Sequence, residues 1–343
     1  MIIRAAKFHM TFKKTTCKQM KAIFFETYGK PEEVLALKEM ASPIPRENEV
    51  LIKIFATAIN DYDWSMVRGK PYLYRLMFGL LKPRHPIAGM ELAGIVKGIG
   101  AKVSKLKVGD AVFGDISGFG FGTFAEHICI HEDAVLIKPD ELSFELAAAI
   151  PHASTLALQA LRDIGKMEQG QKVLINGGGG GVGTIGLQLA KLKNCEVNGV
   201  DSGEKLAMMK SLGFDQVINY KKTDFTKTGE TYDLILDCKT NKTPFSYLRA
   251  LKPSGIYVTI GGNLSSLISV LFWGKIFSIF STKKLQILSL KPNEGLDEIA
   301  QLVIQSKIIA KIDGPYTLED TARLIQYFGE GKHKGKIVIK VNG

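Results

Sequence analysis

The sequence predicts an α/β protein of two domains, a β-rich one followed by one built on a doubly wound parallel sheet. Three observations predict it. Short alternating segments separated by glycine-rich turns fill the first 150 residues, and strands alternating with helices follow them. Between strand and helix at the start of the second part stands a run of five glycines, 177–181. The length of 343 residues fits two domains at about 100–200 residues each.

The first domain is predicted from strands that alternate between apolar and polar residues. Glycine-rich turns at 98–100 and 118–122 separate the later of these strands. This spacing is typical of a compact, barrel-like unit. The expected strands are 21–25, 49–56, 91–97, 110–114 and 123–130.

The second domain is predicted from a change of period after Ile150. Because strands then alternate with helices, they are expected to pair in parallel. The last segment, 335–341, is expected to be a strand that returns to the first domain. The expected boundaries are a basic tail over 1–19, a first domain over 20–145 and 310–343, and a second over 146–309. The expected strands are 173–176, 196–200, 217–219, 232–237, 255–260 and 285–290, and the helices are 182–193, 204–212, 244–251 and 295–306.

Charge and cysteine content exclude several classes of protein. The net charge is +11, and residues 1–20 hold five bases and no acid. No nucleic-acid-binding motif accompanies this charge, so an anionic cofactor or an acidic surface is the simpler explanation. Four widely spaced cysteines exclude a disulfide scaffold and a cysteine-rich zinc module, which favours a reducing, cytoplasmic location. The tail fits no signal peptide and is expected to be disordered or to reflect an upstream start.

One apolar segment, 264–280, raises the question of a membrane span. Its seventeen residues include a central lysine, Lys275, and fall short of the roughly 20 apolar residues that a spanning helix requires. We therefore expect a buried or substrate-facing helix and no membrane span.

The glycine run predicts a dinucleotide site. Read as G-x-G-x-x-G it gives Gly178, Gly180 and Gly183, between a buried strand and a helix that begins near Gly181. Glycines let the backbone approach a pyrophosphate, and the helix start offers free N–H groups and its positive dipole end. The predicted cofactor contacts here are Gly178, Gly180, Gly181, Val182, Gly183 and Gly261.

The choice between NADP(H) and NAD(H) stays open, with NADP(H) favoured. Asp201, 23 residues after Gly178, stands where an acid bonds the ribose hydroxyls of NAD. Ser202, Lys205 and Tyr220 instead offer charge and hydroxyls to a 2′-phosphate.

Several motifs together resemble the medium-chain dehydrogenase/reductase superfamily. They are the opening 20–23, the segments 58–64, 89–94 and 108–113, the glycine turn and the ending 335–339. Within that superfamily the chain is most similar to the zinc-free quinone oxidoreductases. The resemblance implies a GroES-like catalytic domain, a Rossmann domain, an active site between them, hydride transfer with a nicotinamide cofactor, and a homodimer.

Two departures from the zinc enzymes of that superfamily argue against a metal. Asn60 and Met90 replace the cysteine and histidine ligands, and both are poor ligands for zinc. Glu91 would then be the one remaining ligand, and a catalytic zinc normally has three from the protein. Without a Lewis acid, a quinone or α,β-unsaturated carbonyl is the better small-molecule substrate, because hydride addition yields a delocalised enolate. A metal-free alcohol or aldehyde dehydrogenase and a non-catalytic, crystallin-like binding protein remain the alternatives.

The resemblance also suggests catalytic residues. Asn60 matches an asparagine beside the nicotinamide, Thr155 matches a hydroxyl near it, and Tyr62, Tyr72 and Tyr74 are candidate proton donors. Asp63 is expected to cap the helix after Asn60. The histidines show no ligand spacing and are assigned no chemistry; the ones considered are His85, His127, His152 and His333.

Overall fold

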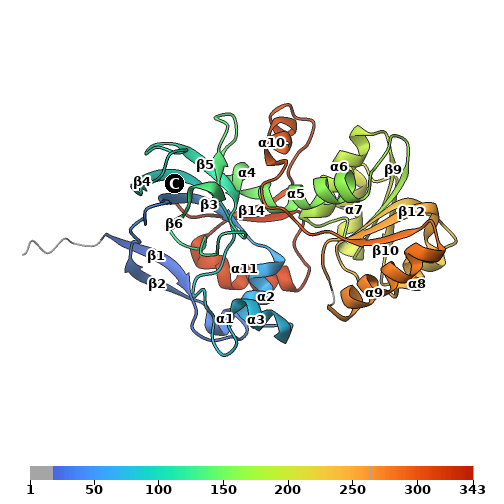
Figure 1. Cartoon of the computed structure of the whole chain (residues 1–343), viewed down its shortest axis with the longest axis horizontal. Helices are drawn as coiled ribbons and strands as arrows, with labels where there is room; N and C mark the ends of the chain where they lie inside the picture. Colours follow the sequence, from blue (N-terminus) through green and yellow to red (C-terminus); the bar gives the residue numbers. More distant parts are fainter. Residues whose placement is uncertain (1–17, 263, 343) are drawn as a thin grey trace, which may run out of the picture.

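The computed structural model describes residues 18–262 and 264–342, so nearly all of the expected basic tail lies outside the described residues. Two units stand side by side, and the chain ends in the unit where it begins (Figure 1). One unit is built mainly on antiparallel strands, with one parallel pair at the edge of its larger sheet, and the other is built on a parallel sheet.

The first unit combines strands from both ends of the chain. Its larger sheet has the order β14-β15-β3-β4-β5-β7, with β6 also paired to β3, and a separate two-stranded sheet joins β1 and β2. The last strand, β15, runs antiparallel to β3, with Val338 opposite Ala58. The strands are β1 (Gln19–Phe24), β2 (Ala36–Ala41), β3 (Glu49–Ala58), β4 (Glu91–Ile99), β5 (Ala111–Asp115), β6 (His127–His131), β7 (Leu136–Ile137), β14 (Ile312–Thr317) and β15 (Lys336–Lys340). Its helices are α1 (Pro31–Val34), α2 (Asp61–Arg68), α3 (Arg75–Phe78) and α11 (Thr321–Gly329).

The second unit confirms the predicted doubly wound sheet. Its six strands are all parallel, in the order β10-β9-β8-β11-β12-β13. The strands are β8 (Lys172–Asn176), β9 (Glu196–Asp201), β10 (Gln216–Asn219), β11 (Tyr232–Asp237), β12 (Leu251–Thr259) and β13 (Lys284–Ile287). The helices are α6 (Gly181–Leu192), α7 (Leu206–Leu212), α8 (Pro244–Arg249), α9 (Leu264–Phe280) and α10 (Leu296–Ile304).

Two helices lie where the units meet. These are α4 (Phe144–Ala149) and α5 (Pro151–Leu158), and every residue of α5 is buried. One apolar core contains Ala56 and Ala58 of β3 together with Val173 and Ile175 of β8. Since a shared core resists relative movement, it holds the first turn of α5 firmly against the β-rich unit.

Some elements differ from the sequence prediction for physical reasons. The strand expected over 123–130 begins only at His127, because the residues before it bond to β1 instead, Ile23 N–H donating to Phe124 O. β2 escaped prediction because its residues are almost all exposed and show no apolar alternation. β14 contains a Gly-Pro pair, which masks a strand pattern.

The segment 264–280 is helical as expected, but it is not buried. Val270 is buried, whereas Ile268, Leu271, Phe272, Ile279 and Phe280 are all more than half exposed. The expectation of a buried helix was therefore wrong for most of α9, and among its described side chains only Leu267 reaches the cavity described below. In the described part of the chain, no helix has the length and apolar character needed to cross a bilayer.

Candidate active site

A cavity of about 490 Å³ lies between the two units. It brings together residues from α2, α5, the glycine turn, the ends of the parallel strands and the approach to β15. Nine of the residues predicted for the site line it: Asn60, Tyr62, Tyr74, Gly180, Gly181, Val182, Asp201, Lys205 and Gly261.

The glycine turn forms the floor of this cavity. β8 ends at Asn176, Gly177 turns the chain with φ +94°, and α6 begins at Gly181. A Cβ added at Gly180 would stay 3.6 Å or more from every neighbour, so this position has room for a side chain at the cavity. The first N–H groups of α6 therefore point into a cavity with room for an anion.

The other two predicted glycines serve packing. A Cβ at Gly183 would lie 2.4 Å from the carbonyl oxygen of Gly177, and one at Gly178 would lie 2.7 Å from Met209 Cε. Neither residue lines the cavity. Their small size lets α6 start close to the strand end, which is a supporting role.

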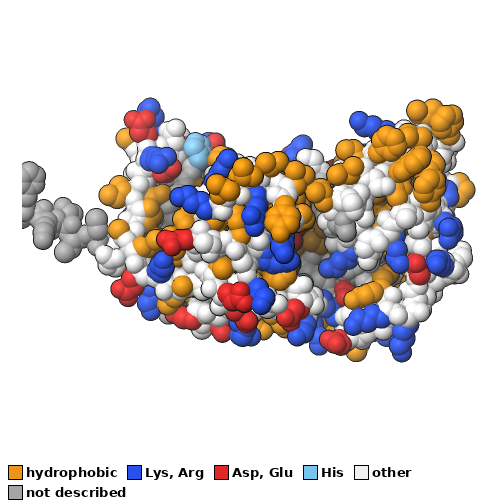
Figure 2. All heavy atoms as spheres, turned by 90° about the horizontal axis from the view of Figure 1, so that it is seen from below, with side chains coloured by type: hydrophobic (Ala, Val, Ile, Leu, Met, Phe, Trp, Pro, Cys, Tyr) orange, Lys and Arg blue, Asp and Glu red, His pale blue; other side chains and the backbone are white. Residues whose placement is uncertain are grey.

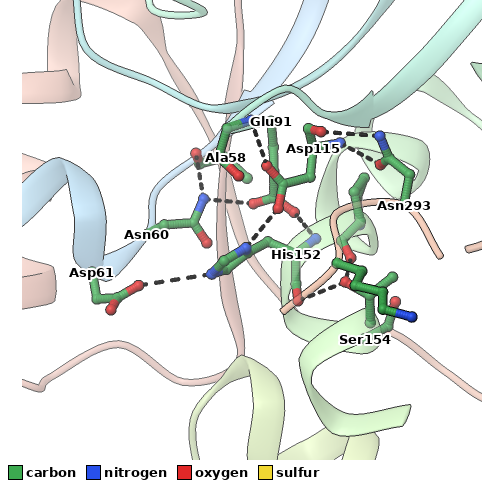
Figure 3. A network of polar contacts seen from close by, with 12 residues as sticks. Ala58, Asn60, Asp61, Glu91, Asp115, His152, Ser154 and Asn293 are labelled. Carbon is green, nitrogen blue, oxygen red and sulfur yellow. Dashed lines mark hydrogen bonds and ion pairs between the residues drawn. The ribbon is translucent and has the colours of Figure 1, made fainter. Parts of the chain in front are cut away.

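A buried cluster of charges lies against Asn60. The side-chain amide of Asn60 donates to Glu91 Oε2 at 2.7 Å, and its Oδ1 accepts a hydrogen bond from Lys336 Nζ. Lys336 Nζ also lies 2.5 Å from Glu91 Oε2. The ammonium thus lies between residues 60 and 91, and Asn60 uses both ends of its amide within the protein. Figure 3 shows the bond from the Asn60 amide to Glu91.

His152 stands next to this cluster on the first turn of α5. Its backbone N–H donates to Glu91 Oε1 at 2.6 Å, and its Nδ1 lies 2.7 Å from Asp115 Oδ2. Its Nε2 lies 3.9 Å from Asp61 Oδ1 on the cavity side (Figure 3). Burial favours the neutral ring, but the carboxylates of Asp115, Asp61 and Glu91 outweigh burial and raise the pKa of His152.

Asp115 is itself held in place from the second unit. Its backbone N–H donates to Asn293 Oδ1 at 2.8 Å, and Asn293 Nδ2 donates back to the carbonyl of Asp115 at 3.0 Å. Burial raises the pKa of the Asp115 carboxyl, but His152 and Ser117 more than compensate and lower it. Both shifts favour the charged form of the pair, a carboxylate with an imidazolium.

Further basic groups line the cavity. Lys205 and Lys239 face the cavity together with His333. Burial, reinforced by Lys205, Lys239 and Lys336, lowers the pKa of His333 to about 3, so its ring is neutral. His333 Nδ1 is buried and has no hydrogen-bond partner among the described residues. An unpaired polar atom beside three lysines is suited to a phosphate-bearing ligand that fills the cavity.

Of the residues predicted to contact the ribose or its 2′-phosphate, only Asp201 and Lys205 line the cavity. The carboxylate of Asp201 accepts from Gly179 N–H at 2.9 Å and from Ser202 N–H at 2.8 Å, and it lies 3.8 Å from Lys205 Nζ. Its charge is therefore largely used within the protein. Ser202 and Tyr220 do not line the cavity, and Tyr220 is 54% exposed.

Only some of the hydroxyl residues that were predicted to be catalytic line the cavity. Tyr62 and Tyr74 line the cavity, and burial raises the pKa of Tyr62 to about 12. Tyr72 is 67% exposed and lies outside it. Thr155 is fully buried and donates to the carbonyl of Pro151 at 2.7 Å, within its own helix. The structure therefore does not bring Tyr72 or Thr155 to the site.

Sequence reasoning missed four residues of the site: Lys336, Lys239, His152 and His333. A lysine after a glycine at a strand start carries no chemical motif by itself. The histidines lack the spacing of metal ligands, so the sequence assigns them no chemistry. A general acid needs no such spacing, only a neighbouring carboxylate that the fold supplies.

A bound nicotinamide dinucleotide fits these residues. The open position at Gly180, the start of α6 and the unpaired His333 Nδ1 beside Lys205 offer it a place. A catalytic zinc does not fit: Asn60 and Met90 are poor ligands, and the Lys336 ammonium would repel a second cation. The absence of zinc stays a prediction.

Comparison with known proteins agrees with this geometry. Residues 46–140 match the model of the alcohol dehydrogenase GroES-like domain, and residues 212–339 match that of the zinc-binding dehydrogenase. The chain is 30% identical over 331 residues to 2-methylene-furan-3-one reductase of Solanum lycopersicum, covering 94% of this chain and 79% of that one.

Two solved structures extend the likeness to the whole fold. The quinone oxidoreductase from Coxiella burnetii is 29% identical with a TM-score of 0.81, covering 95% of this chain and 100% of that one. The Escherichia coli quinone oxidoreductase complexed with NADPH is 25% identical with a TM-score of 0.79, covering 93% and 99%. The chain therefore belongs to the medium-chain dehydrogenase/reductase superfamily, in its quinone oxidoreductase-like branch.

Proposed function

We propose that this protein is a zinc-independent NAD(P)H-dependent reductase of quinones or α,β-unsaturated carbonyls. The observation that carries the proposal is the cavity itself. It joins a dinucleotide-binding turn to a buried Asn60–Glu91–Lys336 cluster that contains an ammonium group paired with a carboxylate, and no metal ligand set. The relatives named as quinone and enone reductases support the same substrate class.

The buried cluster is suited to stabilising an oxyanion. When bound, the nicotinamide supplies a hydride to the carbon conjugated with the carbonyl, and negative charge then gathers on the carbonyl oxygen. Lys336 carries the positive charge that favours such an oxygen. Asn60 holds the ammonium in place rather than donating to the substrate, since its amide is already used by Glu91 and Lys336.

His152 is the group best placed to supply the proton. The reduction of a conjugated carbonyl adds one hydride and one proton, so a proton donor is needed after hydride transfer. His152 has a raised pKa, a carboxylate on Nδ1 and an Nε2 on the cavity side near Asp61. We propose that Nε2 donates its proton to the substrate and that His152 is then reprotonated from solvent past the exposed carboxylate of Asp61. Tyr62 is the second candidate, although its raised pKa makes it a weaker acid.

NADPH is the proposed cofactor in preference to NADH. Asp201 is occupied by two backbone N–H groups and Lys205, so its repulsion of a 2′-phosphate is reduced. Lys205 and Lys239, which also line the cavity, add attraction. Ser202 and Tyr220 no longer contribute to this preference, because neither lines the cavity.

A homodimer through the parallel sheet is also proposed, in a reducing, cytoplasmic setting. β13 is an edge strand, and α9 packs beside it with Ile268, Leu271 and Phe272 exposed. Covering such residues with a second copy would remove apolar surface from water. Sedimentation of the native chain and of Phe272→Asp tests this, since the variant should be monomeric.

One experiment tests the function and its alternatives together. NADPH and NADH oxidation is followed with a panel of quinones, enones and saturated aldehydes, before and after treatment with a zinc chelator. We expect turnover with quinones or enones that the chelator does not reduce. Turnover only with saturated aldehydes would favour the metal-free alcohol or aldehyde dehydrogenase, and cofactor binding without any turnover would favour a non-catalytic protein.

A further inference from the structure

The segment after α2, residues 70–84, exposes an unusual number of large apolar side chains. Within ten residues, six are about half or more exposed: Tyr72 67%, Leu73 49%, Leu76 60%, Met77 58%, Leu80 64% and Leu81 88%. Scattered single apolar residues are normal on a protein surface, but such a concentration is typical of a surface that binds another protein or a membrane.

These side chains are held outward by a fixed backbone. Phe78 is buried and contacts the rings of Tyr62, Tyr74 and Phe121 edge-on. The hydroxyl of Tyr28 donates to the carbonyl of Gly79 at 2.6 Å. Because Phe78 and Gly79 anchor the segment inward, its leucines cannot turn into the core, and their exposure belongs to the folded state.

The same segment is strongly basic. From Trp64 to Met90 the chain contains no Asp or Glu, but it contains five Lys or Arg residues: Arg68, Lys70, Arg75, Lys82 and Arg84. None of the five forms an ion pair with any acid in the described part of the chain. Figure 2, viewed from the side on which α3 lies in Figure 1, shows hydrophobic and basic side chains beside a hollow, with acidic side chains elsewhere on the same face.

This apolar and basic surface borders the active-site cavity. Pro71 and Tyr74 of the same segment line the cavity, as does Tyr62 just before it. A surface that covers residues 70–84 would therefore lie at the cavity entrance.

We propose that residues 70–84 dock this protein onto an anionic lipid membrane, without spanning it. Apolar side chains interleaved with lysine and arginine and free of acid are the pattern of a peripheral lipid-binding surface, where leucines enter the acyl boundary and bases meet the headgroups. A second copy of this chain is disfavoured as the occupant, since an isologous contact would bring two copies of this basic, acid-free segment together. If the proposed function is right, a lipophilic quinone would enter the cavity from the bilayer.

The test is co-sedimentation of the full chain with vesicles of phosphatidylcholine alone or mixed equally with phosphatidylglycerol. We expect binding to the mixed vesicles that weakens as salt rises, and little binding to phosphatidylcholine alone. The double variant Leu80→Asp with Leu81→Asp should lose at least about tenfold in binding, which corresponds to about 1.4 kcal/mol. Ile44→Asp is the matched control, since Ile44 is 81% exposed but lies elsewhere, and it should bind as the native chain does.

Three further readouts keep the outcomes distinct. Thermal unfolding and reduction of a small water-soluble quinone should be the same in the double variant and the native chain, so a vesicle defect cannot come from misfolding or a broken site. Absence of native binding to the mixed vesicles overturns the proposal, as does binding retained by the double variant, which would assign it to another surface such as the basic residues 1–19. A change of oligomeric state in the double variant would instead identify a protein interface.

Discussion

Some residues of the site are buried charges that are compensated by one another, so removing one of them leaves its partner without a counter-charge. Lys336 is 6% exposed and Glu91 is fully buried, so each neutralises the other out of water. Removing one member of such a pair commonly costs about 3–5 kcal/mol, because the other charge is left uncompensated.

Lys336→Met is therefore expected to lower the free energy of unfolding by several kcal/mol. Lys340→Met is the control, since it changes the same residue type on the same strand at an exposed position. Urea denaturation measures both. If the two variants are equally stable, the ammonium contributes nothing to stability, whereas recovery on adding Glu91→Gln would confirm that the charges are coupled.

The proton assigned to His152 gives the reaction a pH dependence of defined sign. The pKa of His152 is raised above 6.5, so the ring is charged below that pH in both folded and unfolded states. The stability that it contributes is complete below pH 6.5 and is lost as pH rises through the higher folded pKa. The supply of the proton should fail over the same range.

We expect the turnover rate with an enone to fall above this pKa, and His152→Gln to be slow with no such decline. His127→Gln is the matched control, because His127 is also buried but lies outside the cavity. Rates from pH 5 to 9 in water and in deuterium oxide would decide. If His152→Gln keeps the pH profile and the solvent isotope effect of the native chain, another group, such as Tyr62, donates the proton.

At the scale of elements, the strand–turn–helix of the glycine run divides its glycines into two kinds. Gly180 has room for a side chain at the cavity, whereas Gly183 is in close contact with the backbone of Gly177. Substitution should therefore affect ligand binding at one position and folding at the other.

Gly180→Asp is expected to leave the unfolding temperature nearly unchanged and to abolish NADPH binding, because its carboxylate opposes the pyrophosphate in the space it fills. Gly183→Ala is expected to cost about 1–3 kcal/mol in stability, because its Cβ would lie 2.4 Å from Gly177 O. Thermal unfolding and a fluorescence titration with NADPH measure the two effects. Equal loss of stability in both would show that Gly180 also has a packing role.

The elements also show what the sequence could and could not predict. The parallel strands and α6 were predictable because buried strands and amphipathic helices have distinct periods. β2, exposed almost throughout, has no such period. The glycine turn was predictable because its residues are contiguous. The Asn60–Glu91–Lys336 cluster was not, since residues 276 positions apart meet only after β15 pairs with β3.

At the scale of the whole molecule, charge accumulates where the two units face each other. The cavity has Lys205 and Lys239 from one unit and Lys336 from the other, against Asp61 and Asp201. Burial lowers the pKa of Lys205, with Asp201 partly offsetting this. A dianionic 2′-phosphate near these lysines would gain attraction that a ribose hydroxyl lacks.

Lys205→Ala is therefore expected to weaken NADPH binding by about tenfold or more, which is about 1.4 kcal/mol, and to leave NADH binding within about twofold. Lys239→Ala should act in the same direction. Lys242→Ala is the matched control, because Lys242 belongs to the same loop but pairs with Asp224 outside the cavity. Calorimetric titration with both cofactors at two salt concentrations measures these changes, and the NADPH preference should shrink as salt screens the lysines. If Lys205→Ala alters neither affinity and Asp201→Ala weakens NADH alone, the enzyme uses NADH, and the basic wall of the cavity serves the pyrophosphate instead.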